Sequence, residues 1–382
     1  MKKVVAYLLL TAIVLISAFG LNGCGYEYQN PELLRDYTDH NLAGTTLNVY
    51  NWGEYISDGS EGSMDVVKEF EKLTGIKVNY STFDSNESMY SLINYGAVSY
   101  DIVIPSDYMI ERMISEDLLQ KIDVSKLRNY HYVDEKYKNT HYDPNNEYSV
   151  PYCVGMVGLI YNTKILKETP DSWGIMWDEK YKNDILTFNN PRDAFAIAQF
   201  LLGHDINTSN PDEWREAAEL LKKQKSVLQA YVMDEVYNKM ESGSAAIAPY
   251  YAGDFISMSD INEDLAFVYP KEGTNFFVDA VCIPKNAENY EAAMLFIDYL
   301  LEPEIALANA EFIYYASPNT GVTNNPAYIF NDSECPEYEY RHILYPDETE
   351  LPKAQDYWDM SKETRKLFDE LWQDVKLYRS TR

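Results

Sequence analysis

The feature that most constrains the fold is a repeated alternation of short apolar strands with amphipathic helices. In the first series, the apolar periodicity predicts strands at residues 47–51, 76–80 and 101–105 and helices at residues 63–73 and 87–95. Strand–helix cycles of this length build largely parallel sheets that helices cover on both faces. The sequence therefore predicts an α/β architecture.

A second series of the same kind follows a polar stretch at residues 125–148. It opens with two extended strands, at 148–154 and 159–161. The remaining predicted elements are strands at 184–188, 245–249, 265–269 and 278–283 and helices at 192–202, 211–223, 233–241, 289–301, 303–311 and 361–378. Since 382 residues suffice for two domains that each bury a core, we expect two α/β halves joined by extended segments.

The N-terminus carries the pattern of a secretory signal. Lys2 and Lys3 precede an apolar run at residues 4–19, which is short for a membrane-spanning helix of about 20 residues. The following Leu21-Asn22-Gly23-Cys24 resembles the bacterial lipobox, whose cysteine becomes lipid-modified and starts the mature chain. We expect a signal peptide at 1–23, an acylated Cys24 and a tether at 24–43. A plain signal peptide or an uncleaved anchor is the alternative.

The chain is strongly acidic, with 61 Asp and Glu against 32 Lys and Arg and a net charge of −29. Cleavage before Cys24 would remove two lysines and no acid, which leaves 30 − 61 = −31. Such a field repels phosphates and argues against a nucleic-acid partner. It suits a cationic partner, although a dispersed acidic surface that maintains solubility has the same composition.

No motif for catalysis or metal binding is present, so no enzyme activity, cofactor or metal is predicted. Cys153, Cys282 and Cys335 have no close spacing, allow at most one disulfide and are better interpreted as buried thiols. The five histidines have no paired spacing. Among so many carboxylates, a catalytic pair cannot be selected or dismissed by counting.

Aromatic and acidic residues gather where the predicted strands end, the edge at which open α/β sheets bind ligands. Carboxylates hold ammonium groups through charge-assisted hydrogen bonds, and aromatic faces add cation–π attraction. These stretches could therefore form a cage for a flexible organic diammonium, although each aromatic alone could pack in a core. The four stretches are Asn51-Trp52-Gly53-Glu54-Tyr55, Ser106-Asp107-Tyr108, Tyr250-Tyr251-Ala252-Gly253-Asp254 and Phe276-Phe277-Val278-Asp279.

From about Leu47 to the C-terminus, the chain resembles the bacterial spermidine/putrescine-binding lipoproteins and periplasmic proteins of polyamine ABC transporters. The resemblance implies a type-II periplasmic-binding-protein fold, in which two α/β lobes joined by crossing hinge strands enclose a ligand cleft. Lobe 1 would comprise 44–157 plus 278–323, and lobe 2 would comprise 158–277 plus 324–382. The resemblance to this family rests most specifically on residues 51–55, 80–90, 100–106, 122–127, 143–152 and 270–273.

The resemblance also implies a ligand-binding set. Asp193, Asp254 and Asp279 would neutralise ammonium groups, and the aromatic members would pack against the methylene chain. A C-terminal polar contact would come from Trp358 or Gln355. The complete set is Trp52, Glu54, Tyr55, Ser106, Tyr108, Asp193, Tyr251, Asp254, Phe277, Asp279 and Tyr315.

The chain departs from the family pattern at three positions. Gly53 replaces a hydroxyl residue, Asn190 stands where spermidine binders tend to have Asp, and Tyr251 replaces Trp. These changes leave the preference between putrescine and spermidine open. Arg192, the one basic residue that we place near the cleft, is expected to orient neighbouring acids.

The expected function is that of a monomeric, extracytoplasmic, lipid-anchored solute-binding protein that delivers polyamine to a membrane permease. One alternative is a receptor for another small cationic or polar solute on the same fold. A second is an extracellular hydrolase that uses two carboxylates. A surface adhesin or sensor is a third, for which the sequence offers no positive feature.

Overall fold

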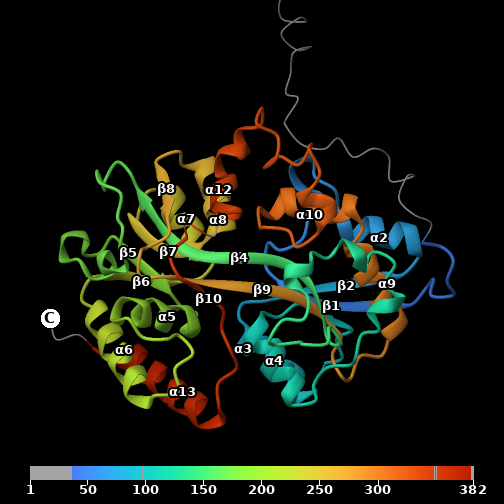
Figure 1. Cartoon of the computed structure of the whole chain (residues 1–382), viewed down its shortest axis with the longest axis horizontal. Helices are drawn as coiled ribbons and strands as arrows, with labels where there is room; N and C mark the ends of the chain where they lie inside the picture. The colour runs from blue at the N-terminus through green and yellow to red at the C-terminus, as the bar shows by residue number, and fades with distance from the viewer. Residues whose placement is uncertain (1–36, 97, 348, 350, 380–382) are drawn as a thin grey trace, which may run out of the picture.

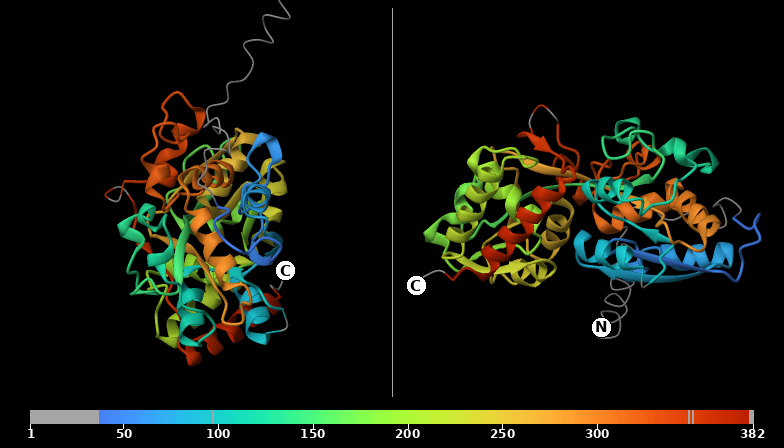
Figure 2. Two further views of the ribbon diagram at one scale, coloured as in Figure 1. Left: turned by 90° about the vertical axis from the view of Figure 1, so that its right-hand side faces the viewer. Right: turned by 90° about the horizontal axis from the view of Figure 1, so that it is seen from below.

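Two long strands cross the middle of the molecule and connect its two halves (Figure 1). They are β4 (Ser149–Asn162) and β9 (Thr274–Cys282), which pair with each other in antiparallel register. Seen from below, one half lies on each side of these strands (Figure 2). The computed structural model describes residues 37–96, 98–347, 349 and 351–379. The predicted signal peptide, Cys24 and tether residues 24–36 lie outside these ranges.

We call the right-hand half of Figure 1 the β1 half, because its sheet is built around β1. Its strands β2 and β3 flank β1, and both pair with it in parallel. The segment 124–137 adds three short 3₁₀ helices and packs against α9. The elements are β1 (Thr46–Trp52), α2 (Val66–Thr74), β2 (Lys77–Phe83), α3 (Asn86–Tyr95), β3 (Ile102–Val103), α4 (Asp107–Ser115), α9 (Tyr290–Leu300), α10 (Pro303–Ile313) and α11 (Thr320–Thr323).

We call the left-hand half the β5 half, because β5 lies between β6 and β7 and pairs in parallel with both. Helices α5, α6 and α13 cover one face of its sheet, and α7, α8 and α12 cover the other (Figure 1). The elements are β5 (Ile185–Phe188), α5 (Pro191–Leu202), α6 (Pro211–Gln224), β6 (Leu228–Val232), α7 (Glu235–Glu241), β7 (Ile247–Tyr251), α8 (Ala252–Ile261), β8 (Leu265–Val268), α12 (Arg341–Leu344), β10 (Ala354–Gln355) and α13 (Lys362–Leu377).

The strand order is β2-β1-β3-β9-β4-β7-β5-β6, with β8 also pairing with β4 and β10 with β9. The prediction of a largely parallel sheet is therefore only half right. The outer strands of each half run parallel, but β9 pairs antiparallel with β3 and β4, and β4 also pairs antiparallel with β7 and β8. The chain crosses from one half to the other along β4 and returns along β9, so these two strands must run in opposite directions. Local periodicity carries no information on the direction of a strand.

Local capping explains most helix boundaries. Helix α2 begins at Val66 rather than 63, because the Asp65 carboxylate accepts a hydrogen bond from Lys68 N, and it ends at left-handed Gly75. Helix α5 starts at Pro191, where the side chain of Asn190 caps Arg192 N. The sequence missed α4, α8 and β6, and it placed the β7 strand two residues too early.

The predicted break between strands 148–154 and 159–161 is wrong, because β4 is continuous. Its glycines make room for aromatic rings. A Cβ at Gly155 would overlap the ring of Phe277, and one at Gly158 would overlap the ring of Phe267. Gly155 thus allows Phe277, on the neighbouring strand, to lie directly over the β4 backbone.

The three remaining cysteines are buried free thiols. The described residues include no helix long and apolar enough to span a bilayer. They also contain no cluster of three or more His, Cys, Asp or Glu side chains suited to a metal ion. The predicted lobe boundaries at 157/158 and 277/278 fall inside β4 and β9, the strands shared by both halves.

Candidate functional site

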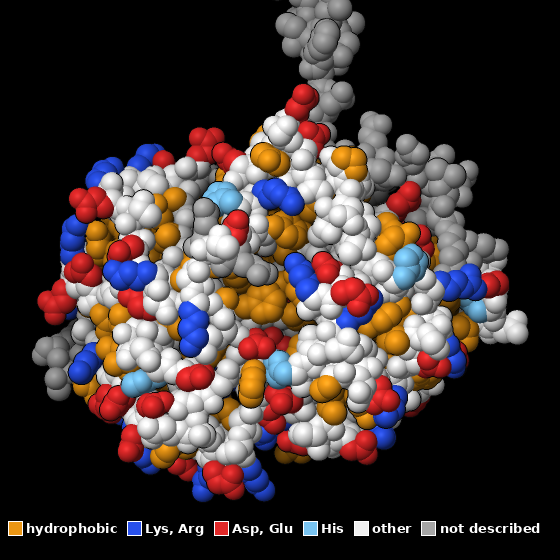
Figure 3. All heavy atoms as spheres, in the orientation of Figure 1, with side chains coloured by type: hydrophobic (Ala, Val, Ile, Leu, Met, Phe, Trp, Pro, Cys, Tyr) orange, Lys and Arg blue, Asp and Glu red, His pale blue; other side chains and the backbone are white. Residues whose placement is uncertain are grey.

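A cavity that opens to solvent lies between the two halves, and all eleven predicted ligand-binding residues line it. In the space-filling view, the surface between the halves is recessed and exposes hydrophobic and acidic side chains (Figure 3). The segments that meet there are far apart in the chain. Among the described residues, the lining contains six carboxylates, ten aromatic side chains and no Lys, Arg or His.

The turn after β1 supplies one wall of the cavity. Trp52 donates its indole hydrogen to Ile104 O over 2.9 Å, which fixes the ring against β3. Glu54 adopts a left-handed conformation (φ 49°), so the chain reverses and directs Tyr55 inward. Tyr152 Oη donates to Tyr55 O over 2.8 Å and holds the turn on β4.

Asp279 lies inside β9, in agreement with the strand predicted at 278–283, although β9 begins four residues earlier. Tyr55 Oη donates to its Oδ2 over 2.6 Å. Burial raises the pKa of Asp279 to about 6, although hydrogen bonds from Ser106 and Tyr55 oppose the shift. Since an unpaired buried carboxylate is costly, a cation in the cavity would restore its charge.

Asp193 is held by three donors in the first turn of α5. Tyr251 Oη and Asn190 Nδ2 reach its Oδ2 over 2.7 and 2.8 Å, and Tyr357 Oη reaches its Oδ1 over 2.9 Å. Burial raises the pKa of Asp193 to about 6 against these hydrogen bonds. The Asn190 amide thus donates to a carboxylate that an acid at position 190 would repel.

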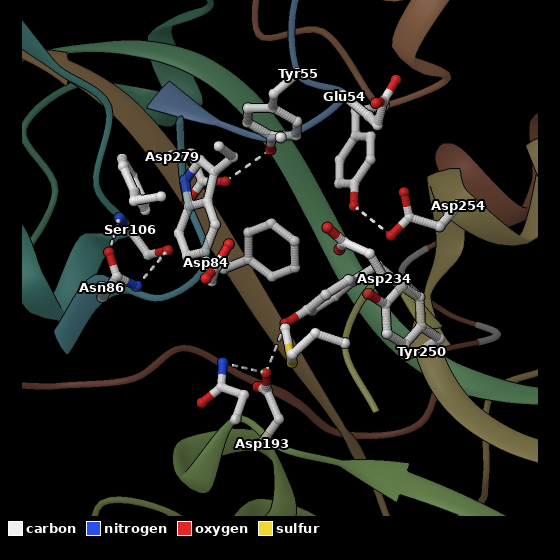
Figure 4. Close-up of a pocket in the computed structure, with 18 of the residues that line it drawn as sticks. Glu54, Tyr55, Asp84, Asn86, Ser106, Asp193, Asp234, Tyr250, Asp254 and Asp279 are labelled. Carbon is white, nitrogen blue, oxygen red and sulfur yellow. Dashed lines mark hydrogen bonds between the residues drawn. The ribbon is translucent and has the colours of Figure 1, made fainter. Parts of the chain in front are cut away.

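Asp254 lies in the first turn of α8, a helix that the sequence did not predict. It accepts hydrogen bonds from Tyr237 Oη over 2.8 Å and from Tyr315 Oη over 3.0 Å. Burial raises its pKa to about 7. Asp193, Asp254 and Asp279 lie at three different sides of the cavity (Figure 4).

Ser106 and Tyr108 flank the start of α4, where Asn86 organises both. Asn86 Nδ2 lies 3.0 Å from Ser106 Oγ and 3.2 Å from Tyr108 Oη, and Tyr108 Oη donates to Glu87 over 3.0 Å. Figure 4 shows the paired contacts of Asn86 with Ser106. Ser106-Asp107-Tyr108, which the sequence predicted as a loop after a strand, therefore forms the N-terminus of helix α4.

The cavity also has members that the sequence analysis missed. The C-terminal contact is Tyr357, not Trp358 or Gln355, neither of which lines the cavity. Asp84 and Asp234 add two exposed carboxylates, one from each half, and neither has a hydrogen bond or ion pair with a described residue. A Cβ at Gly53 would lie 3.7 Å from Asp234 Oδ2, so Asp234 faces the turn after β1.

Arg192 does not orient the acids, contrary to the prediction. Its guanidinium is buried outside the cavity lining, where Nη2 donates to Asn207 Oδ1 over 3.0 Å and to Trp358 O over 3.1 Å. It also lies 4.5 Å from the centre of the Tyr357 ring. Arg192 therefore anchors the C-terminal segment to the β5 half.

A cleft between two α/β halves that share crossing strands, lined by inward-facing polar and aromatic groups, defines a two-lobed solute receptor of the type-II binding-protein fold. The model of the bacterial extracellular solute-binding protein family matches residues 65–335, and the chain belongs to this family. The family consists of solute-binding proteins rather than enzymes, and its members act outside the cytoplasm.

Named relatives cover most of the chain. The spermidine/putrescine-binding periplasmic protein of Salmonella typhimurium is 35% identical over 88% of this chain and 93% of its own length. The solved spermidine/putrescine substrate-binding protein PotD of Streptococcus pneumoniae is 34% identical, with a TM-score of 0.71 over 88% of this chain and 100% of its own. The TpPotD lipoprotein of Treponema pallidum is 26% identical, with a TM-score of 0.73 over 86% and 99% of the two chains.

Proposed function

We propose that this protein is the polyamine receptor of an ABC transporter, which captures spermidine or putrescine outside the cell and delivers it to a membrane permease. One observation carries the proposal: the cavity combines six carboxylates with ten aromatic side chains and has no basic residue among its described lining. Such a cavity repels anions and leaves a zwitterion's carboxylate without a partner. The named ligands of the relatives support the same class of solute.

The three inner acids bind the ammonium groups. Asp193, Asp254 and Asp279 each keep lone pairs beside the tyrosine hydroxyls that position them, and their burial makes a cationic partner favourable. Trp52, Phe277 and the tyrosines enclose the methylene chain, and their faces add about 0.5–2 kcal/mol of cation–π attraction for each desolvated contact.

Calorimetric titration tests the proposal with spermidine and putrescine against a neutral sugar and a zwitterionic amino acid. We expect binding of a polyamine only. Asp279→Asn should weaken binding at least about tenfold, because an ammonium then lacks its charged acceptor. Asp171→Asn, at an exposed pair with Lys271, should change nothing. Absence of polyamine binding refutes the proposed receptor, and an affinity for Asp279→Asn within twofold of the parent protein refutes the charge role of Asp279.

We further propose that the receptor is anchored to the cell membrane by lipid on Cys24. The lipobox-like Leu21-Asn22-Gly23-Cys24 supports the anchor, and one relative is itself named a lipoprotein. Two acyl chains would hold the protein stably at a membrane. Mass spectrometry of the mature N-terminus should find acylated Cys24, and Cys24→Ala should release the protein from membranes. An unmodified Cys24 in membrane-bound protein would contradict the anchor.

A further inference from the structure

The segment that carries Tyr357 into the cavity passes between the two halves on its way from β10 to α13 (Figure 1). The β5 half holds it firmly. Asn207 Nδ2 donates to Asp356 O over 2.8 Å, and Trp358 N donates to Asn207 Oδ1 over 2.8 Å. Strand β10 adds parallel pairing with β9. Residues 356–358 are therefore attached to the β5 half.

His141 of the β1 half contacts both neighbours of Tyr357. Its Nδ1 lies 3.0 Å from Asp356 Oδ2. Its ring stacks on Trp358 with centroids 5.2 Å apart and an interplanar angle of 25°. The side chain is about a quarter exposed, so the contact is partly shielded from water. One histidine thus connects the two halves at the residues on either side of a cavity tyrosine.

Other charges face His141 from the elements around it. Glu111 of α4 lies on its other edge, with Oε2 3.9 Å from His141 Nε2, and the same Oε2 accepts a hydrogen bond from Asp359 N over 2.7 Å. Asp107 and Lys136 share an adjoining cavity with His141 and Asp356. Farther along the same seam, Arg365 reaches Glu116 over 3.4 Å.

We propose that His141 is a positioning residue: in its protonated form it ties segment 356–358 to the β1 half and so holds Tyr357 in the closed cleft around the ligand. This inference rests on the proposed function, since it assigns a proton-dependent closure to that site. Opening the cleft separates His141 from Asp356 but leaves Glu111 beside it, because Glu111 and His141 belong to the same half.

The direction of the pH effect follows from these contacts. Burial alone lowers the pKa of His141, but the hydrogen bond and charge of Asp356, with the charges of Glu111 and Asp107, raise it above its usual 6.5. The closed form therefore holds its proton more tightly than an open form that lacks Asp356. The resulting stabilisation of the closed form is fully present below pH 6.5 and is lost as pH rises through the raised pKa.

The experiment compares spermidine dissociation constants of the parent protein, His141→Gln and Asp356→Asn from pH 6 to pH 9. At pH 6, His141→Gln should bind at least about threefold more weakly than the parent. The ratio of the variant's dissociation constant to that of the parent should approach one by pH 9. Titration of the cavity acids affects all these proteins alike and cancels in the ratio. His342→Gln, at a histidine that contacts Glu339 O, is the matched control and should show a ratio of one throughout.

The outcomes separate a proton-dependent role from packing alone. A His141→Gln ratio that is constant with pH, or below about 1.5 at pH 6, overturns the proposal. Asp356→Asn should reproduce the pH-dependent loss, and adding His141→Gln to it should cause no further pH-dependent change. If the parent protein does not bind spermidine, the proposed function fails first. Small-angle scattering then tests the ligand-free protein, in which either variant should be more open than the parent at pH 6 and no more open than the parent at pH 9.

Discussion

Tyr315, which follows α10, donates its hydroxyl hydrogen to Asp254 at the start of α8 over 3.0 Å, so a hydrogen bond joins the two halves across the cavity. Gly253 permits this approach, because a Cβ there would lie 2.5 Å from Tyr315 Cδ2. The Asp254 carboxylate therefore both lines the cavity and takes part in a contact between the two halves.

Tyr315→Phe should weaken polyamine binding about tenfold while keeping the ring in place. The loss leaves Asp254 with Tyr237 as its hydroxyl donor, and a lost hydrogen bond to a charged group costs about 1.5 kcal/mol or more. Titration calorimetry measures the change. Tyr328→Phe, which removes a buried contact with Tyr345 outside the cavity, is the control and should leave affinity unchanged. Equal effects of the two variants would contradict the role of Tyr315.

Polyamine binding should release protons near pH 6.5. The pKa values of Asp193 and Asp279 are about 6 and that of Asp254 is about 7, whereas the usual value is 3.8. A bound ammonium favours the ionised carboxylates, so affinity should fall as pH drops below about 7. Calorimetry in two buffers of different ionisation enthalpy should detect proton release at pH 6.5 and little at pH 8.5. Identical heats in both buffers at pH 6.5 would disprove the linkage.

The same acids should make the ligand-free protein more stable at mildly acidic pH. Between pH 3.8 and pH 7, the folded chain holds protons on Asp193, Asp254 and Asp279 that the unfolded chain has released. Their contribution to the free energy of unfolding therefore rises as pH falls through this window. Urea titrations of the parent protein and Asp254→Asn at pH 5.5 and 7.5 should show a smaller pH dependence in the variant. An unchanged dependence would exclude Asp254 as a source.

Asp84→Asn and Asp234→Asn should slow polyamine association rather than abolish binding. Both residues are exposed at the cavity, although partial desolvation of the Asp234 carboxylate, together with the charges of Asp84 and Glu235, raises its pKa. Exposed charges attract a cation over about 10 Å at 0.1 M salt and are screened beyond that. Stopped-flow tryptophan fluorescence should show an association rate about threefold lower at low salt and equal to the parent at 0.5 M salt. Glu334→Gln, at an exposed acid outside the cavity, should have no effect.

Gly155→Ala should lower the free energy of unfolding by about 1–3 kcal/mol, because a methyl group there overlaps the Phe277 ring. It should also weaken polyamine binding, since Phe277 lines the cavity. At Gly174, a Cβ would meet nothing closer than Ser172 Oγ at 3.2 Å, so Gly174→Ala is the milder control. Thermal and chemical denaturation compare the two. A Gly155→Ala protein as stable as Gly174→Ala would show that the ring can move at no cost.

The helices with clear caps were predictable from the sequence. Asn190-Pro191 and Gly203 mark the ends of α5 within a residue, because N-cap amides, an N1 proline and a left-handed glycine act locally. The predicted gap in β4 has the opposite cause. Gly155 lies in that gap, and its role depends on Phe277, more than 100 residues away in the chain.

The candidate site divides in the same way. Trp52, Asp193 and Asp279 stood in recognisable motifs and line the cavity. Tyr357 and Asp234 had no local signal, since a tyrosine in a polar C-terminal segment and an acid before a short helix are ordinary surface residues. Their positions follow from how the β10–α13 segment and α7 lie against the opposite half.

The sequence by itself determined the alternating α/β character, the acidic charge, the secretory pattern and the residue types of a cationic-ligand cage, because composition, periodicity and capping are local properties. Only the tertiary structure decided the antiparallel course of β4 and β9, which tyrosine positions which carboxylate, and the contact of His141 with Asp356. These depend on packing between distant segments, and burial there moves the pKa values of Asp193, Asp254 and Asp279 into the range where a bound cation can control them.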